Sequence, residues 1–168
     1  MKNSFKLLSL LLLILIFSCS DNSSKVYDTL ASDFSDSIEK YNATRFDFQY
    51  DALTPQSSYF VGCKLKFLKL ESNGEIVSIR QKVTFENDSI SRIFMVKSIN
   101  IENRNKKENI VSIVDYRNRI VKTYINDKLE RSVKVSRSSK KEQEFIYEIK
   151  NNTEIKYNCG KLKINNNR

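Results

Sequence analysis

The sequence predicts an α+β domain that is mostly β, with one N-terminal helix followed by an antiparallel meander of about nine or ten strands. Apolar residues recur every three or four positions near the N-terminus, which is the period of one helix face, and every second position from Arg45 onward, which is the period of one sheet face. Pairs such as Asn-Gly and Asn-Asp separate the alternating runs and favour tight hairpin turns. Strands joined by such turns are antiparallel neighbours.

The helix is expected over about 25–41. Its apolar stripe should dock against the sheet, because its polar face is acidic, whereas a helix lying on a membrane surface usually carries basic residues there. Either Ser23 or Ser24 is suited to cap its first turn. The stripe consists of Val26, Leu30, Phe34, Ile38 and Tyr41.

The strands are expected from alternation and from their content of Val, Ile, Phe and Tyr. Leu65 and Phe67 should share one face, with Lys64 and Lys66 on the other. Phe46 and Phe48 start the pattern. The further runs are 61–67, 77–85, 93–101, 110–116, 120–125, 129–135, 144–149, 154–157 and 162–164, with turns expected at 73–74, 87–88, 126–127 and 151–152.

One helix cannot cover the apolar face of so many strands, so the sheet is expected to curl into a barrel or half-barrel with the helix on its concave side. If the sheet closes, its first and last strands meet, which would bring Cys63 and Cys159 together. Two thiols in an exported domain suggest one disulfide, and a loop of about one hundred residues closed in this way is stabilised by ~4–5 kcal/mol in the chain-entropy model. Two separate buried thiols are the alternative.

The first nineteen residues have the layout of an export signal. Lys2 and Lys6 form a basic head, 7–17 is almost entirely apolar, and a polar run follows Cys19. The apolar stretch is too short to span a bilayer, which takes about 20 residues, but it suits the core of a signal peptide.

The residues Ile16-Phe17-Ser18-Cys19 resemble the lipobox of bacterial lipoproteins, in a chain similar to those of Bacteroidota, although Phe17 is bulkier than usual there. The resemblance implies a cleaved signal peptide over 1–18, palmitate or similar acyl chains on Cys19, a tether over 19–25 and a single β-rich domain over 26–168. Several acyl chains anchor a protein stably, so the expected location is the outer membrane, on its periplasmic or surface face. An ordinary cleaved signal is the alternative.

Basic residues are concentrated in one part of the chain. Between 100 and 141 there are 12 Lys or Arg and 5 Asp or Glu. Such a patch can recruit an anionic envelope component or a protein, and nucleic acid is not expected as a partner of an exported chain. Solvated strand edges and turns are the simpler alternative. The candidate residues are Arg104, Lys106, Lys107, Arg117, Arg119, Lys122, Arg131, Lys134, Arg137, Lys140 and Lys141.

The sequence carries no recognisable catalytic motif. It has no His, which removes the usual general base and a common metal ligand, and it has no Gly-rich phosphate loop. We therefore expect no enzyme activity, metal or cofactor. Two functions remain: a lipid-anchored binding protein, or a carrier of acyl chains similar in architecture to the outer-membrane receptors of lipoprotein localisation. A carrier would need an apolar cavity, for which the aromatic candidates are Phe46, Phe48, Phe67, Phe85 and Phe145.

Overall fold

The structure of the protein is a computed structural model that describes residues 24–51, 54–101, 106–135 and 140–159. Over these residues it has two helices and eight strands. In chain order these elements are α2 (Lys25–Lys40), β1 (Thr44–Phe46), β2 (Gln56–Val61), β3 (Lys64–Asn73), β4 (Val77–Glu86), β5 (Ser89–Ile101), β6 (Lys106–Asp115), β7 (Ile120–Ile125), β8 (Lys128–Lys134) and α3 (Lys140–Tyr157).

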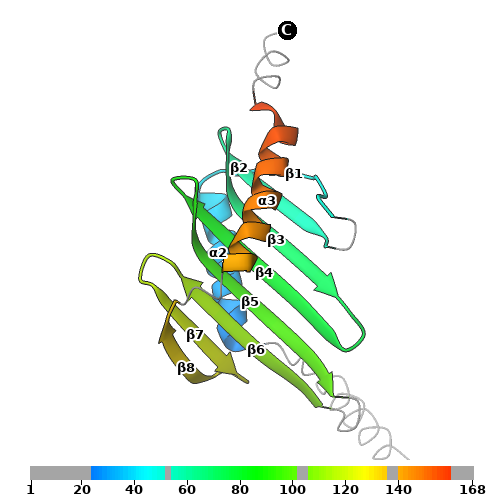
Figure 1. Ribbon diagram of the computed structural model, residues 1–168, viewed down its shortest axis with the longest axis vertical. Coiled ribbons are helices and arrows are strands. Elements are labelled where there is room, and N and C mark those ends of the chain that lie inside the picture. The colour runs from blue at the N-terminus through cyan, green and yellow to red at the C-terminus, as the bar shows by residue number, and fades with distance from the viewer. Residues whose placement is uncertain (1–23, 52–53, 102–105, 136–139, 160–168) are drawn as a thin grey trace, which may run out of the picture.

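The eight strands form one antiparallel sheet in chain order, with β1 and β8 at its two edges. The α+β class and the meander are therefore confirmed, but the described sheet has eight strands where about nine or ten were expected, and it is not closed into a barrel. The two helices lie on opposite faces of the sheet (Figure 1). One buried cluster includes Ile146 and Ile149 of α3, and the other includes Tyr27 and Phe34 of α2. The second helix covers the face that curling would otherwise have to bury.

The predicted helix at the N-terminus is confirmed as α2. Ser24 is its N-cap and accepts a hydrogen bond from the backbone N–H of Tyr27. Asp127, in the turn between β7 and β8, accepts further hydrogen bonds from the Ser24 hydroxyl and from the backbone N–H groups of Lys25 and Val26. These bonds fix the start of α2 to the β7–β8 turn.

The C-terminal part of the prediction was wrong, because 140–157 is a helix and the expected turn at 151–152 lies inside it. Phe145, Tyr147 and Ile149 alternate as they would in a strand. The buried side of α3 instead follows helical spacing and includes a lysine and a threonine, which hid it from a search for apolar periodicity. The third strand expected in this region, 162–164, lies outside the described residues. The buried residues are Ile146, Ile149, Lys150 and Thr153.

Three irregularities interrupt the sheet, and the one between β7 and β8 leaves Glu130 as an extra residue. Opposite Tyr59 and Phe60 of β2, the paired residues of β3 are Phe67 and Leu65, so Lys66 is an extra residue. Leu65 accordingly packs on the α3 side and Phe67 on the α2 side, and the expectation that they share one face was wrong. The pairing of β4 with β5 leaves Ser91 as an extra residue in the same way. Such β-bulges change the direction of the side chains beside them.

The hairpin turns match the sequence signals for them. Asn87 and Asp88 have φ values of 48° and 62°, and Asn126 and Asp127 have 47° and 67°. Positive φ at both central residues is what the two-residue turns between strands require, and Asn and Asp tolerate it.

A disulfide joins Cys63, in the turn between β2 and β3, to Cys159, just beyond α3, with 5.4 Å between their Cα atoms. The sequence analysis suggested a disulfide between these same two cysteines. The expected route to that pairing was wrong, because α3 crosses the sheet and carries Cys159 to it, whereas a closed sheet was expected (Figure 1). The bridge fastens the end of α3 to the β2–β3 turn.

Candidate functional site

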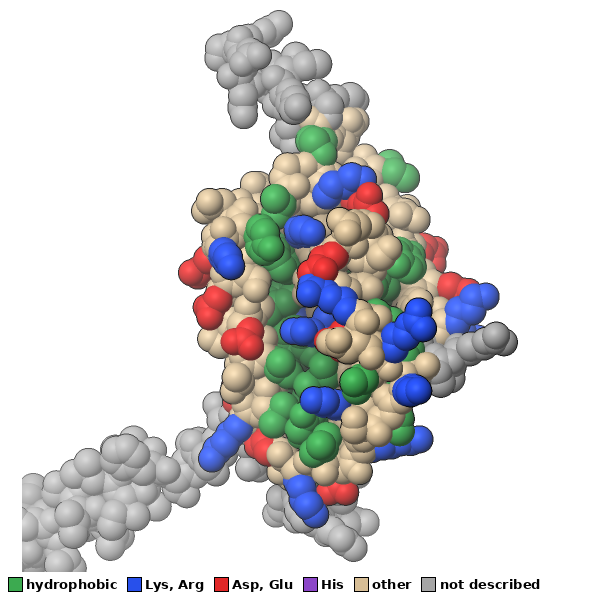
Figure 2. All heavy atoms as spheres, turned by 90° about the vertical axis from the view of Figure 1, so that its left-hand side faces the viewer, with side chains coloured by type: hydrophobic (Ala, Val, Ile, Leu, Met, Phe, Trp, Pro, Cys, Tyr) green, Lys and Arg blue, Asp and Glu red, His purple; other side chains and the backbone are tan. Residues whose placement is uncertain are grey.

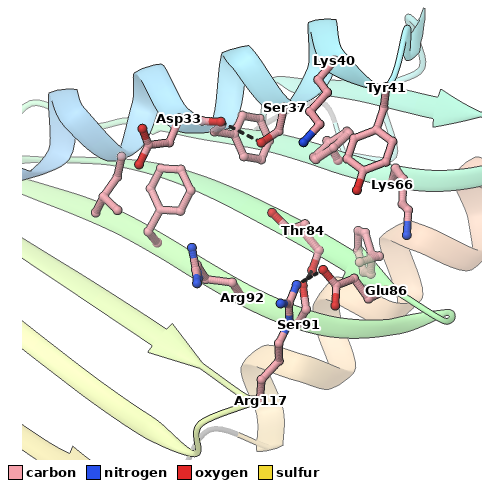
Figure 3. Close-up of a pocket in the computed structure, with 15 residues that line it drawn as sticks. Asp33, Ser37, Lys40, Tyr41, Lys66, Thr84, Glu86, Ser91, Arg92 and Arg117 are labelled. Carbon is pink, nitrogen blue, oxygen red and sulfur yellow. Dashed lines mark hydrogen bonds and ion pairs between the residues drawn. The ribbon is translucent and has the colours of Figure 1, made fainter.

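A cavity of about 280 Å³ lies between the second half of α2 and the ends of β3, β4 and β5. We call it the α2 pocket. Its floor is aromatic and its rim carries four cationic side chains (Figure 3). The floor consists of Phe34, Phe67, Phe85 and Phe94, and the cationic side chains are Lys40, Lys66, Arg92 and Arg117.

The aromatic floor holds the end of α2 in place. The ring of Phe34 packs edge-on against Phe67 and Phe94, with centroids 5.4 and 5.6 Å away. Tyr41, the C-cap residue of α2, lies 6.0 Å from the Phe67 ring. Because the helix stripe is fixed in this way, Lys40 and Tyr41 reach the rim from the last turn of α2 (Figure 3).

The β-bulges at Lys66 and Ser91 border the α2 pocket. The bulge at Lys66 places Phe67 on the floor and leaves Lys66 itself on the rim. At the second bulge the Ser91 hydroxyl donates a hydrogen bond of 3.0 Å to the carbonyl oxygen of Thr84. The pocket therefore depends on two local departures from regular strand pairing, which are common next to functional sites.

The cations of the rim differ in how they are neutralised. Arg117 forms an ion pair with Glu86, and Arg92 lies 3.3 Å from a carboxylate oxygen of Asp115. Burial alone would raise the pKa of the Asp115 carboxyl, but hydrogen bonds from Asn118 and the nearby Arg92 hold that pKa below its usual value. Within the described part of the chain, Lys40 and Lys66 form no ion pair. Asp33 of α2 also lines the pocket and, within the same described part, forms no ion pair, so these two ammonium groups outweigh its single carboxylate and leave the pocket positively charged.

A second cavity, of about 270 Å³, adjoins the α2 pocket and shares Leu30 and Arg92 with it. We call it the β7 pocket. Its remaining walls come mainly from β6 and β7 and combine apolar side chains with Asp115, Asn118 and Lys122. Figure 2, which faces the side where β7 and β8 lie in Figure 1, shows hydrophobic side chains with Lys and Arg side chains among them. The apolar wall residues are Leu30, Ile113, Ile120 and Tyr124.

The predicted basic patch is divided between several places. Arg117 and Lys122 line the two pockets, and Arg119 lies in the same β6–β7 turn as Arg117. Lys134 is paired with Ile120, on the side of the pockets, whereas Arg131 is paired with Thr123, on the opposite face. Lys140 and Lys141 begin α3; Lys106 and Lys107 begin β6; and Arg104 and Arg137 lie outside the described residues.

Three cations of the α2 pocket were missed by the sequence analysis. Lys40 and Lys66 look like ordinary solvated lysines of a helix end and a strand, and Arg92 like the polar position of a strand. The one available signal was that the apolar stripe ends at Tyr41 with Lys40 beside it. Nothing in the pattern of residues signals the bulge at Lys66.

Lys82, which lines neither pocket, has a lowered pKa. Lys82 lies beside α2, where its ammonium group donates a 2.8 Å hydrogen bond to the Tyr27 hydroxyl and sits 4.3 Å from the centre of that ring. Burial, followed by the charges of Lys69 and Arg80, lowers the pKa of Lys82 to about 8. Its amine therefore loses its proton more readily than an exposed lysine does.

Among the described residues, no three His, Cys, Asp or Glu side chains are grouped so that they could hold a metal ion. The helices of this part of the chain are too short or too polar to cross a membrane. Comparisons with protein-family models, curated proteins and solved structures find no match to this chain. Its function is therefore inferred from its own residues.

Proposed function

We propose that this protein is a lipid-anchored, non-catalytic binding protein of the cell envelope. Acyl chains on Cys19 hold it at the outer membrane, and the α2 pocket docks a protein partner. The α2 pocket carries the proposal, because Lys40 and Lys66, which form no ion pair with any described residue, lie on the rim above an aromatic floor. Charges of this kind attract and orient an oppositely charged partner, while apolar floor and wall surface adds affinity.

The position of the tether supports this role. Only residues 19–23 separate an acylated Cys19 from Ser24, and five residues span about 18 Å at full extension. Ser24 is fixed at the β7–β8 turn by Asp127. The 16 residues of α2 then extend about 24 Å to the helix end that borders the pocket. A lipid-anchored chain would therefore hold the pocket on the side away from its anchor.

The alternative, a carrier of acyl chains, has less support. Ligand cavities usually enclose about 300–1,000 Å³. Each of the two pockets described here is somewhat smaller, and the larger one has a charged rim. The aromatic residues suggested as cavity lining do not all gather around one space. Phe67 and Phe85 both line the α2 pocket, but Phe46 packs edge-on against Phe60 and Tyr157, and Phe145 is exposed.

The proposal is tested by photo-crosslinking in intact cells. A benzoylphenylalanine at Ser37 would face the α2 pocket, whereas the same residue at Ser32, which is exposed and does not line the pocket, is the matched control. We expect one discrete protein adduct from position 37 and none from position 32. Equal adducts from both positions, or none from 37, would contradict a docking role for the pocket.

The anchor is tested separately by the Cys19→Ala variant. We expect wild-type protein in the membrane fraction, labelled by radioactive palmitate, and the variant unlabelled and outside that fraction. An unlabelled wild-type chain would show that the signal is cleaved without lipidation.

A further inference from the structure

We infer that the partner enters the two adjoining pockets as an extended acidic segment. One of its carboxylates lies between Lys40 and Lys66 in the α2 pocket, and one of its apolar side chains fills the β7 pocket. This inference rests on the proposed function and specifies the chemistry of the partner.

The charges of the rim favour a carboxylate. The guanidinium groups of Arg92 and Arg117 are already engaged by Asp115 and Glu86. Among the described lining residues, what remains is two ammonium groups, Lys40 from the end of α2 and Lys66 from the bulge of β3, and the one carboxylate of Asp33, so the charge beside the cavity is still positive (Figure 3). The planar guanidinium group of arginine can bind two phosphate oxygens at once, which an ammonium group does less well. In this pocket both guanidinium groups are already paired with carboxylates. A single carboxylate suits two ammonium groups that approach from different elements.

The β7 pocket favours an apolar side chain. Leu30 of α2, Ile113 of β6 and Ile120 of β7 line it and are only half-buried in the free protein. An aliphatic or aromatic side chain placed there would remove apolar surface from water on both partners. Because the β7 pocket shares Leu30 and Arg92 with the α2 pocket, one ligand can reach both without a break.

The distance between the pockets fits an extended chain. The α2 pocket lies over β3 to β5 and the β7 pocket over β5 to β7. Their centres are therefore about two strand spacings apart, or roughly 10 Å. An extended peptide rises about 3.3 Å per residue, so the acidic and apolar residues should stand two to four positions apart.

The test pans a displayed library of random decapeptides against the mature chain carrying Cys19→Ala, which keeps every described residue. We expect the selected peptides to share an Asp or Glu two to four positions from a Leu, Ile or Phe. The affinity of the consensus peptide, measured by fluorescence anisotropy, should fall at least about tenfold in the double variant Lys40→Glu, Lys66→Glu and should weaken as salt rises.

The matched control is the double variant Lys128→Glu, Arg131→Glu, which makes the same charge change on β8, outside both pockets. We expect it to bind within about twofold of wild type. The four basic residues that these two variants replace are exposed or half-buried, so the substitutions should not disturb the core. An unchanged melting temperature and circular dichroism spectrum would show that both variants fold.

Three results would overturn the inference: a consensus without an acidic residue, undiminished binding by the Lys40 and Lys66 variant, or no selected peptide at all. A discrete cellular adduct from position 37 combined with any of these would leave the docking role standing and remove only the acidic segment. Absence of the adduct together with a clear acidic consensus would instead count against the cellular role.

Discussion

Asp127 caps α2 from 103 positions away along the chain and so determines where the tether leaves the domain. One of its oxygens lies 2.5 Å from the Ser24 hydroxyl and 3.0 Å from the backbone nitrogen of Val26, and the other lies 3.0 Å from that of Lys25. Burial alone would raise the pKa of the Asp127 carboxyl, but these hydrogen bonds outweigh it and lower that pKa. The folded state therefore favours the ionised carboxylate.

Replacing Asp127 with Ala should lower the free energy of unfolding by about 1–2 kcal/mol at pH 7, as loss of a helix cap does. A lowered pKa in the folded state contributes stability above the unfolded value, near 4, and that contribution is lost as pH falls through the folded value. The Asp127→Asn variant keeps an acceptor but has no charge to lose. Urea unfolding at pH 7 and pH 3 should show the difference between wild type and this variant shrinking at low pH. A difference independent of pH would contradict the role of the charge.

Lys82 should make stability rise in alkaline solution. Its pKa is 10.5 in the unfolded chain and about 8 in the fold, so between these values the unfolded state binds more protons, and stability increases with pH. Water reaches part of this side chain, so we expect a gain on the order of 1 kcal/mol between pH 7.5 and pH 10. The Lys82→Arg variant keeps its charge throughout and should lack this gain in urea unfolding. Equal slopes against pH for both proteins would contradict the lowered pKa.

The elements differ in how far their sequences reveal them. The apolar stripe of α2 and the Asn-Asp turns both depend on residues that are close together in the sequence, so both were predictable. The helix α3 was not, because its buried side uses Lys150 and Thr153, which are satisfied by specific partners. The ammonium group of Lys150 bonds Glu154 at 2.7 Å, and the Thr153 hydroxyl receives a hydrogen bond from Gln56 at 2.8 Å. Polar residues that are buried with specific hydrogen-bonding partners carry no apolar signal.

A pair of substitutions tests the packing of α3. Ile149 is buried to 1% exposure, whereas Ile155, six residues later on the same helix, is 72% exposed. Ile149→Ala should lower the free energy of unfolding by about 2–5 kcal/mol, because it leaves a cavity between α3 and the sheet. Ile155→Ala should change it by less than about 0.5 kcal/mol. Similar losses from both variants in urea unfolding would show that this segment does not pack as α3 does.

Removing the disulfide tests how much the link between α3 and the β2–β3 turn contributes to stability. Its two cysteines are 96 positions apart, so the bridge restricts a long loop of the unfolded chain. The Cys63→Ser, Cys159→Ser variant should be less stable by about 2–5 kcal/mol while keeping its helical circular dichroism signal. The folded signal should persist because the buried residues of α3 hold it independently. A reducing agent should destabilise wild type to the same degree and leave the variant unchanged.

For the molecule as a whole, the class of fold followed from the sequence but its closure did not. Alternation and turns predict a meander, and a meander needs its apolar faces covered. With only one helix predicted, curling of the sheet was the remaining way to bury its apolar face. In the structure α3 covers that second face, so the sheet stays open. The α2 pocket escaped prediction for a related reason, because it is built where α2 meets two bulges that only the pairing of distant strands creates.

This arrangement separates the two working ends that we propose, the anchor near the β7–β8 turn and the α2 pocket about 24 Å further along the helix. The most direct test places a fluorophore on a single introduced cysteine in the lipidated protein on liposomes that contain nitroxide-labelled lipids. We predict strong quenching for Lys128→Cys, next to the tether, and little for Lys66→Cys, on the rim of the pocket. Strong quenching at both positions would place the pocket against the bilayer and contradict its presentation to a protein partner.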